Sequence, residues 1–318
     1  MNHDDIALAA RPRPGAAEVT AGACACAGVA VNDTTAATAA AWRELHTRAC
    51  APYRQAGRFA WHFARGKLGR DPVFRGLLER GDLPAGARVV DIGCGQGLMA
   101  NLLQACAELA NAGGWPQAWP PPPRARSYHG IELMPRDVER ARRATAGPAP
   151  GLQAQEPMAG GPLAHGPLAL APTFECNDMR RAALPPCELV VILDVLHYVN
   201  HAAQSALLTR VRNALLQGRR DPAVQPHGGG EHSPPARRGR LLLRVGDAAS
   251  TRGFVLSQWV DRAVTLLRGH AVPPTWGRPL AGWVALLREF GFEVKTIPMS
   301  RGTPFANVLL VADLVGQA

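Results

Sequence analysis

Residues 89 to 97 read VVDIGCGQG, in which three glycines fall within five residues directly behind an apolar run. An apolar run, a glycine-rich turn and a helical pattern after it are typical of the strand, loop and helix that bind nucleotide-like cofactors. The spacing is not the dinucleotide fingerprint G-x-G-x-x-G, because position 98 is Leu98, and no Gly-Lys-Ser/Thr follows as in a P-loop. The alternative without a ligand is a tight turn between strand and helix.

Strand and helix patterns alternate on both sides of this loop. Strands are expected at 88–92, 127–132, 173–176, 188–195, 240–246, 292–297 and 306–313. Helices are expected at 97–108, 135–145, 201–217, 254–268 and 279–290. This order predicts an α/β fold with a doubly wound, seven-stranded, mostly parallel sheet. The loop between the last two strands is too short for a crossover, so these two strands should form a hairpin with the last strand antiparallel.

The chain divides into three parts by composition. Residues 1–38 are rich in Ala, Gly and Thr and have few large apolar side chains, which predicts a disordered tail. Residues 39–82 carry apolar residues at helical intervals, broken by Pro52 and Pro72, which predicts an N-terminal helical lid. Residues 83–318 form the predicted catalytic domain. Pro-, Gly- and Arg-rich surface insertions are expected in it at 111–126, 146–172 and 217–239.

The 318 residues carry a formal net charge of +10, with 35 Lys and Arg, of which only Lys67 and Lys295 are lysines. The arginines are dispersed along the chain, which argues against a nucleic-acid partner. Seven cysteines without a paired C-x-x-C spacing predict reduced thiols in a cytoplasmic protein. No basic leader is apparent, no apolar run reaches the ~18 residues of a membrane span, and no metal site is expected.

With Asp91 two residues ahead of the first glycine, the loop resembles the D/E-x-G-x-G-x-G motif of class I S-adenosylmethionine-dependent methyltransferases. The resemblance covers residues 83–315 and implies a Rossmann-like fold with S-adenosylmethionine as the cofactor. It implies that Gly93, Gly95 and Gly97 admit the amino-acid and ribose parts of the cofactor against bare backbone, where a Cβ would collide. Asp91 would offset the positive amino group of the cofactor.

The same resemblance implies three further cofactor positions at strand ends. Glu132 ends the second strand and would accept hydrogen bonds from both ribose hydroxyls; its alternative is a solvated carboxylate at a helix start. Asp178 follows the third strand and would bind the adenine amine, with Met179 packed on the ring, unless Asp178 simply caps a helix. Asp194 ends the apolar run VVILD and would lie beside the methyl donor.

Two histidines are candidates for a catalytic base. His197 follows Asp194 in the segment DVLHYV, and its unperturbed pKa near ~6.5 suits proton transfer at neutral pH. Its alternative is a histidine packed against the cofactor or bonded to its loop. His62 in FAWHFARGKL is the second candidate, because that segment could close as a lid.

The segment DVLHYV also bears on the acceptor. It has neither the Asn/Asp-Pro-Pro-Tyr/Phe of nucleic-acid amino-methyltransferases nor the Pro-Cys of cytosine-C5 enzymes, and its Asp-x-Leu-His form is similar to that of small-molecule methyltransferases. PYRQAGRFAWHFARGKLGRDPVF (52–74), DVLHYV (194–199) and GTPFANVLL (302–310) resemble bacterial enzymes that accompany aryl-polyene or fatty-acid-like biosynthetic clusters. That resemblance implies secondary metabolism and O- or C-methylation of an aromatic or acyl metabolite, which could be bound to a carrier protein. The alternatives are an RNA or protein methyltransferase and a catalytically silent binding protein.

Overall fold

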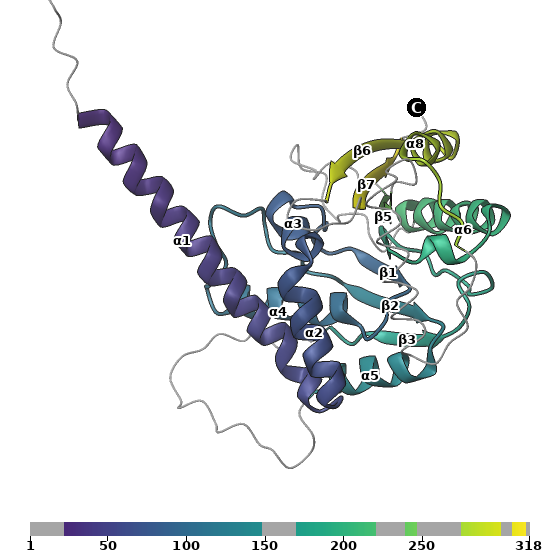
Figure 1. The fold of residues 1–318 in the computed structure, drawn as a ribbon, viewed down its shortest axis with the longest axis horizontal. Helices are drawn as coiled ribbons and strands as arrows, with labels where there is room; N and C mark the ends of the chain where they lie inside the picture. Colours follow the sequence, from purple (N-terminus) through teal and green to yellow (C-terminus); the bar gives the residue numbers. More distant parts are fainter. Residues whose placement is uncertain (1–21, 148–169, 221–238, 247–274, 300–306, 316–318) are drawn as a thin grey trace, which may run out of the picture.

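A computed structural model describes residues 22–147, 170–220, 239–246, 275–299 and 307–315, with side chains from residue 34 onward. The core is a seven-stranded sheet in the order β3-β2-β1-β4-β5-β7-β6 (Figure 1). The strands are β1 (Arg88–Ile92), β2 (Ser127–Glu132), β3 (Thr173–Cys176), β4 (Leu189–Leu193), β5 (Arg240–Gly246), β6 (Phe292–Pro298) and β7 (Asn307–Leu314). The seven-stranded, mostly parallel fold predicted from the sequence is confirmed.

The pairing of the strands follows from the lengths of their connections. β1 to β5 are parallel, whereas β7 pairs antiparallel with both β5 and β6. The predicted hairpin of the last two strands is therefore confirmed. Within the sheet, β7 lies between β5 and β6. β4 is shorter than the predicted 188–195, because the chain leaves the sheet at Asp194, which has a φ of +61°.

Helices cover both faces of the sheet. They are α1 (Gly22–Cys50), α2 (Arg58–Arg70), α3 (Pro72–Arg80), α4 (Leu98–Asn111), α5 (Pro135–Thr145), α6 (His201–Arg220) and α8 (Leu280–Glu289), with short 3-10 turns η1 (Ala51–Arg54) and η2 (Leu196–Tyr198). Val89 of β1 packs in one hydrophobic cluster with α1 to α5, and Val90 packs in a second cluster with α6 and α8. Successive residues of a strand point to opposite faces, so these clusters form the two layers of a doubly wound domain.

The first helix differs from the expectation of a disordered tail over residues 1–38. The structure places residues 22 to 38 in α1, whose N-terminal part extends away from the body of the protein (Figure 1). The run AATAAAW favours a helix because alanine has the highest helix propensity. The helix is held at its other end, where Leu45 and Ala49 are buried in the cluster that includes α4. Residues 1–21 lie outside the described part of the chain.

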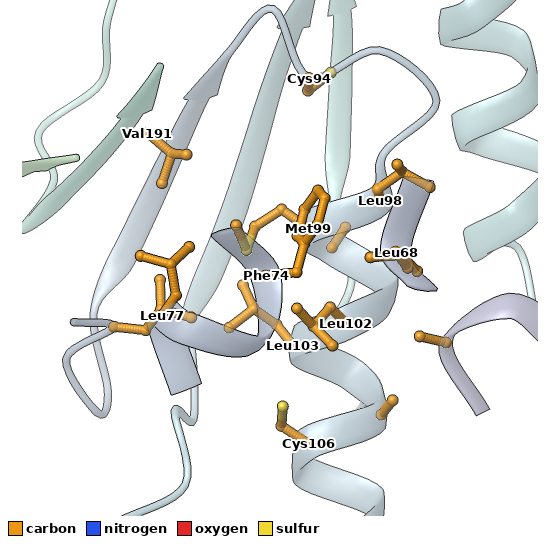
Figure 2. Close-up of a cluster of buried hydrophobic side chains, with 14 of the residues drawn as sticks. Leu68, Phe74, Leu77, Cys94, Leu98, Met99, Leu102, Leu103, Cys106 and Val191 are labelled. Atoms are coloured by element: carbon orange, nitrogen blue, oxygen red, sulfur yellow. The ribbon is translucent and has the colours of Figure 1, made fainter. Parts of the chain in front are cut away.

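Residues 39–82 are helical, as expected, and they are packed into the domain core. Figure 2 shows Leu68 of α2 and Phe74 and Leu77 of α3 gathered around Met99 and Leu102 of α4. These side chains are almost completely buried, so the helices that precede the sheet share its hydrophobic core. A movement of this segment as a lid remains a prediction.

The expected insertions are only partly described. In 111–126, Trp119 is buried and packs edge-on against Trp115, whose indole N–H donates to the carbonyl of Pro120 at 2.9 Å. This stretch therefore covers the core rather than standing off the surface. The start of 217–239 belongs to α6, while most of 146–172, the rest of 217–239 and the helix predicted at 254–268 lie outside the described residues. No described helix has the length and hydropathy needed to cross a bilayer.

Candidate active site

The predicted cofactor residues lie at the carboxyl ends of neighbouring strands or in the loops that follow them. The loop after β1 is bonded to the end of β2 through the N–H of Gly93, which donates to the carbonyl of Ile131 at 2.8 Å. The segment after β3 joins the same end, because the N–H of Asn177 donates to the carbonyl of Glu132 at 3.0 Å. β4 pairs with β1 in parallel, so the turn after β4 adjoins the glycine loop. In open α/β sheets, this edge is the one that binds ligands.

The three glycines of the loop all adopt left-handed backbone angles but have different surroundings. Their φ values are +75° for Gly93, +55° for Gly95 and +74° for Gly97. A Cβ on Gly93 would lie 2.6 Å from Cγ1 of Val195, and one on Gly97 would lie 3.0 Å from the ring of Phe174. A Cβ on Gly95 would have no described atom within 4 Å. Two glycines are thus required by packing inside the protein, and only Gly95 borders open space where a ligand could approach.

Glu132 holds the glycine loop in place. One carboxylate oxygen of Glu132 accepts the N–H of Gly95 at 2.9 Å, and the other accepts the N–H of Met134 at 2.9 Å. Burial raises the pKa of Glu132, and these two backbone bonds oppose the rise. The side chain is therefore not a solvated helix-start carboxylate. Each oxygen keeps a further lone pair, so the carboxylate can still accept bonds from a ligand.

Asp91 is buried in β1 and bonded to a neighbouring strand. Its carboxylate accepts the hydroxyl of Tyr128 at 2.6 Å, and both side chains are almost fully buried. Burial raises the pKa of Asp91 to about 7, and the nearby charge of Glu132 adds to this, while the bond from Tyr128 opposes it. Asp91 therefore changes charge close to neutral pH, which makes its ionisation sensitive to a cation bound nearby.

Asp178 caps a turn at residues 179–181, and no helix follows it. Its carboxylate accepts the backbone N–H of Arg180 at 2.8 Å and pairs with the guanidinium of the same residue. These bonds lower the pKa of Asp178. Met179 is half-buried against the apolar cluster of its sheet face, and its carbonyl accepts a bond from Arg210 at 2.6 Å. Binding of adenine by this pair remains a prediction.

Asp194 is engaged by two cations at the end of β4. The guanidinium of Arg244 donates to both carboxylate oxygens of Asp194, with one bond from Nε at 2.7 Å. Lys67 of α2 lies 3.7 Å from the same carboxylate. The carboxylate predicted to lie beside the methyl donor is thus already part of an ion-pair network.

The two candidate bases occupy different environments. His197 is half-buried in η2, and its carbonyl accepts the N–H of Trp276 at 2.8 Å. Burial lowers the pKa of His197, partly offset by the charge of Asp194, so the ring is neutral at neutral pH. His62 is exposed on α2 with its ring edge-on to Trp61, and no described hydrogen bond or ring contact joins it to the other candidates.

Two participants were missed from the sequence. Tyr128 gives no signal, because a tyrosine in a strand reads as part of the apolar pattern. Arg244 does give one: a charge inside the apolar strand RLLLRVG has to be paired when it is buried. Its partner Asp71 lies 173 residues away and could not be identified from the sequence.

A hollow of about 550 Å³ lies elsewhere on the described surface, between α8 and β6. Its described lining is mostly apolar, from residues such as Leu280 and Val284, and Arg288 is the one charged residue among the described lining residues. Its described lining holds no carboxylate or histidine, unlike the strand-end site. In the described part of the chain, no three His, Cys, Asp or Glu side chains gather as metal ligands.

Comparisons with known proteins add structural neighbours only. No family model matches the chain, and no curated protein matches it. Among solved structures, the magnesium protoporphyrin IX methyltransferase of Synechocystis PCC 6803 with bound S-adenosylhomocysteine is 20% identical, with a TM-score of 0.44. That match covers 81% of this chain and 88% of the neighbour.

Two other neighbours are similar in degree. Human N-acetylserotonin methyltransferase in complex with S-adenosylmethionine is 15% identical over 89% of this chain and 67% of its own, with a TM-score of 0.46. An O-methyltransferase family protein from Burkholderia thailandensis is 14% identical over 83% of this chain and 63% of its own, with a TM-score of 0.47. With identities of 20% or less and TM-scores below 0.5, these likenesses say nothing about the activity of this chain.

Proposed function

We propose that this protein transfers a methyl group from S-adenosylmethionine to a small-molecule acceptor at the edge where β1, β2 and β4 end. The observation that carries the proposal is the hydrogen bond between Glu132 and the glycine loop. Glu132 binds the N–H of Gly95, the one glycine of the three that borders open space. A ligand with ribose hydroxyls beside a close-fitting backbone suits this combination.

The remaining residues suit the other parts of the same ligand. Asp91 offsets the positive amino group, and its raised pKa means that a nearby cation would favour its charged form. Asp178 and Met179 take the adenine, and Asp194 lies beside the methyl donor. Met179 is half-buried on an apolar surface, which is suited to packing an aromatic ring.

The chemistry demands little from the protein itself. When bound, S-adenosylmethionine supplies a methyl group activated by its sulfonium, so the residues bind, orient, exclude water and accept a proton. We propose that His197 accepts the proton released by the acceptor, because its lowered pKa keeps the imidazole neutral. His62 is the second candidate for this step.

The acceptor side of the site favours a small aromatic or acyl metabolite. Trp276 is bonded through its backbone to His197, is 41% exposed, and packs edge-on against His201. An exposed indole beside the proposed base supports an apolar acceptor with a hydroxyl or acidic C–H group. We therefore propose O- or C-methylation in bacterial secondary metabolism, on a free or carrier-bound acceptor.

Calorimetry with S-adenosylmethionine and S-adenosylhomocysteine tests the cofactor assignment. The wild-type protein should bind both, and Glu132→Ala should weaken binding by about tenfold to a hundredfold, because it loses charged hydrogen bonds to the ribose. Glu188→Ala is the matched control. Glu188 is a buried carboxylate that accepts the N–H of Arg88 at 2.7 Å, but it lies at the amino end of β4, away from the strand ends that form the site.

The control separates binding from folding. Glu188→Ala should lose stability and keep wild-type affinity. Equal affinity of Glu132→Ala and wild type would show that the ribose assignment is wrong. A wild-type protein that binds neither ligand would refute the proposed function as a whole.

The pH profile of methyl transfer tests the base. With an acceptor found by comparing the small metabolites of wild-type and deletion strains, the rate should fall as pH drops through a midpoint below ~6.5, where His197 becomes protonated. His197→Ala should lower the rate by about a hundredfold or more and lose this limb. An unchanged rate and profile in His197→Ala would remove His197 from the reaction.

A further inference from the structure

An ion-pair network around a buried arginine links the helices ahead of the sheet to the turn after β4. Arg244 of β5 is 2% exposed and lies between two carboxylates. It pairs bidentately with Asp194 on one side and with Asp71 on the other, where Nη2 donates at 2.7 Å. Lys67 completes the network, 2.7 Å from Asp71 and 3.7 Å from Asp194. Two cations and two carboxylates thus alternate.

The network holds Asp194 in an unusual backbone conformation. Asp194 is the one non-glycine residue with a positive φ in the part of the chain that the structure describes. A left-handed residue of this kind persists where its surroundings determine it, and such residues gather at functional sites. Arg244 holds Asp194 twice, through its guanidinium and through its carbonyl, which accepts the N–H of Asp194 at 3.2 Å.

The turn that begins at Asp194 contacts the glycine loop directly. Val195, the next residue, packs so closely on Gly93 that a Cβ there would lie 2.6 Å from its methyl group. His197 follows in η2 and is bonded to the segment that carries Trp276. A shift of Asp194 would therefore press Val195 against the glycine loop and would also displace His197.

The other side of Arg244 reaches the helices before the sheet. Asp71 joins α2 to α3 and caps α3 by accepting the N–H of Val73 at 3.1 Å. Burial opposes ionisation of Asp71, but Arg244 and Lys67 outweigh it and hold its pKa below the ordinary value. The helical segment 58–80 is thereby fixed to the same guanidinium as the turn after β4.

Arg244 and Asp71 are 2% and 10% exposed in their side chains, whereas Lys67 and Asp194 are 37% and 33% exposed. The burial of the Arg244 guanidinium is poorly explained by stability alone. Desolvation offsets most of the attraction between buried ions, and a well-packed apolar residue often serves stability equally well. The bidentate geometry of Arg244 provides what an apolar residue lacks, a fixed direction for each carboxylate. The arrangement therefore favours a role in orientation.

We propose that Arg244 is a positioning residue for the methyl-donor site: it fixes the turn at Asp194 against the glycine loop and, through Asp71, ties residues 58–80 to that turn. The inference rests on the proposed function for the identity of the ligand. In this role Arg244 acts through Asp194 and Asp71, so its substitution should weaken cofactor binding and increase the mobility of both tied segments.

Arg244→Lys, compared with Arg240→Lys, tests the proposal. Arg240 lies on the same strand and pairs bidentately with Asp313, at 2.7 and 2.9 Å, but at the end of β5 remote from the site. Both variants keep a positive charge and lose a guanidinium fork. Arg244→Lys should weaken S-adenosylmethionine binding about tenfold by calorimetry, because a small displacement of the turn misaligns the site. It should also speed amide hydrogen exchange in 58–80 and 194–198, whereas Arg240→Lys should leave affinity and both segments unchanged.

Asp71→Asn provides a second variant that keeps the Arg244–Asp194 pair. Its amide oxygen can still cap α3, so the fold should persist. We expect faster exchange in 58–80, with 194–198 close to wild type and a smaller loss of affinity than in Arg244→Lys. Wild-type affinity in Arg244→Lys, or an equal loss in Arg240→Lys, would overturn the proposal.

The exchange measurement separates this proposal from the proposed function. If the wild-type protein does not bind S-adenosylmethionine, the proposed function is wrong. Amide hydrogen exchange would still test whether Arg244 couples residues 58–80 to residues 194–198. Faster exchange of both segments in Arg244→Lys alone would uphold the tie. Unchanged exchange in that variant would overturn it.

Discussion

The two halves of the strand-end site are built in different ways. The glycine-loop half is formed by β1, its loop and the end of β2, and its key bonds join Glu132 to Gly95 and Tyr128 to Asp91. The Asp194 half depends on Arg244, which pairs with Asp71 and closes a contact across 173 residues. The first half is a compact motif of neighbouring strands, whereas the second exists only when distant elements have packed.

The difference shows where each half is vulnerable. In the glycine-loop half, side chains are buried and backbones are in close contact, so adding or removing a single atom should cost stability. In the Asp194 half, charged groups hold one another, so the cost of a change depends on which charge is left behind.

The largest expected effect concerns the buried carboxylate of the first half. Because burial raises the pKa of Asp91 from 3.8 to about 7, the folded protein keeps a proton that the unfolded chain releases between these values. The stability from this proton is complete at low pH and is lost as pH rises to about 7. Relative to Asp91→Asn, the free energy of unfolding of the wild type should fall by on the order of 4 kcal/mol between pH 4 and 8. Chemical denaturation across that range measures it, and parallel curves for the two proteins would contradict it.

The next effect distinguishes two glycines of the same loop. Gly93→Ala forces a Cβ against Val195 as well as a left-handed alanine and should cost about 3 kcal/mol of unfolding free energy. Gly95→Ala meets no described atom and should cost about 1 kcal/mol, from its backbone angle alone. Its effect should fall on S-adenosylmethionine binding instead. Denaturation and calorimetry on both variants test the pair, and an equal loss of stability would disprove the difference in their surroundings.

The smallest effect concerns the surface pair of Asp178 and Arg180. Arg180→Ala removes an exposed ion pair, so the melting temperature should stay within experimental error of the wild type. It also frees one side of Asp178, and affinity for S-adenosylmethionine should be unchanged or higher. A clear loss of affinity in this variant would argue that Arg180, rather than Asp178, contacts the ligand.

The sequence predicted most of the fold because its signals are local. β1, β2, β3, β5 and α5 match the expected bounds, since each is an apolar or amphipathic run ended by glycine, proline or a polar residue. The prediction was less successful for the first helix and for the end of β4. Residues 22–38 are helical although they have few large apolar side chains, and β4 ends at Leu193 because the chain turns at Asp194.

The candidate site was predictable to the same local extent. The glycine loop and Glu132 could be placed from strand ends, and the structure joins them. The network around Asp194 could not, because the carboxylate that shares Arg244 comes from the helices before the sheet. An arginine inside an apolar strand shows that a partner exists, but not which residue it is.

The sequence by itself determined the order of strands and helices, the glycine loop and the carboxylates that end the strands. These follow from periodicity and from the few residues that permit a tight turn. The tertiary structure alone decided how those residues are used: Gly93 and Gly97 make room for Val195 and Phe174, Tyr128 holds Asp91, and Arg244 joins Asp71 to Asp194. The reason is physical, since burial, collisions and ion pairs depend on distances between segments that only folding brings together.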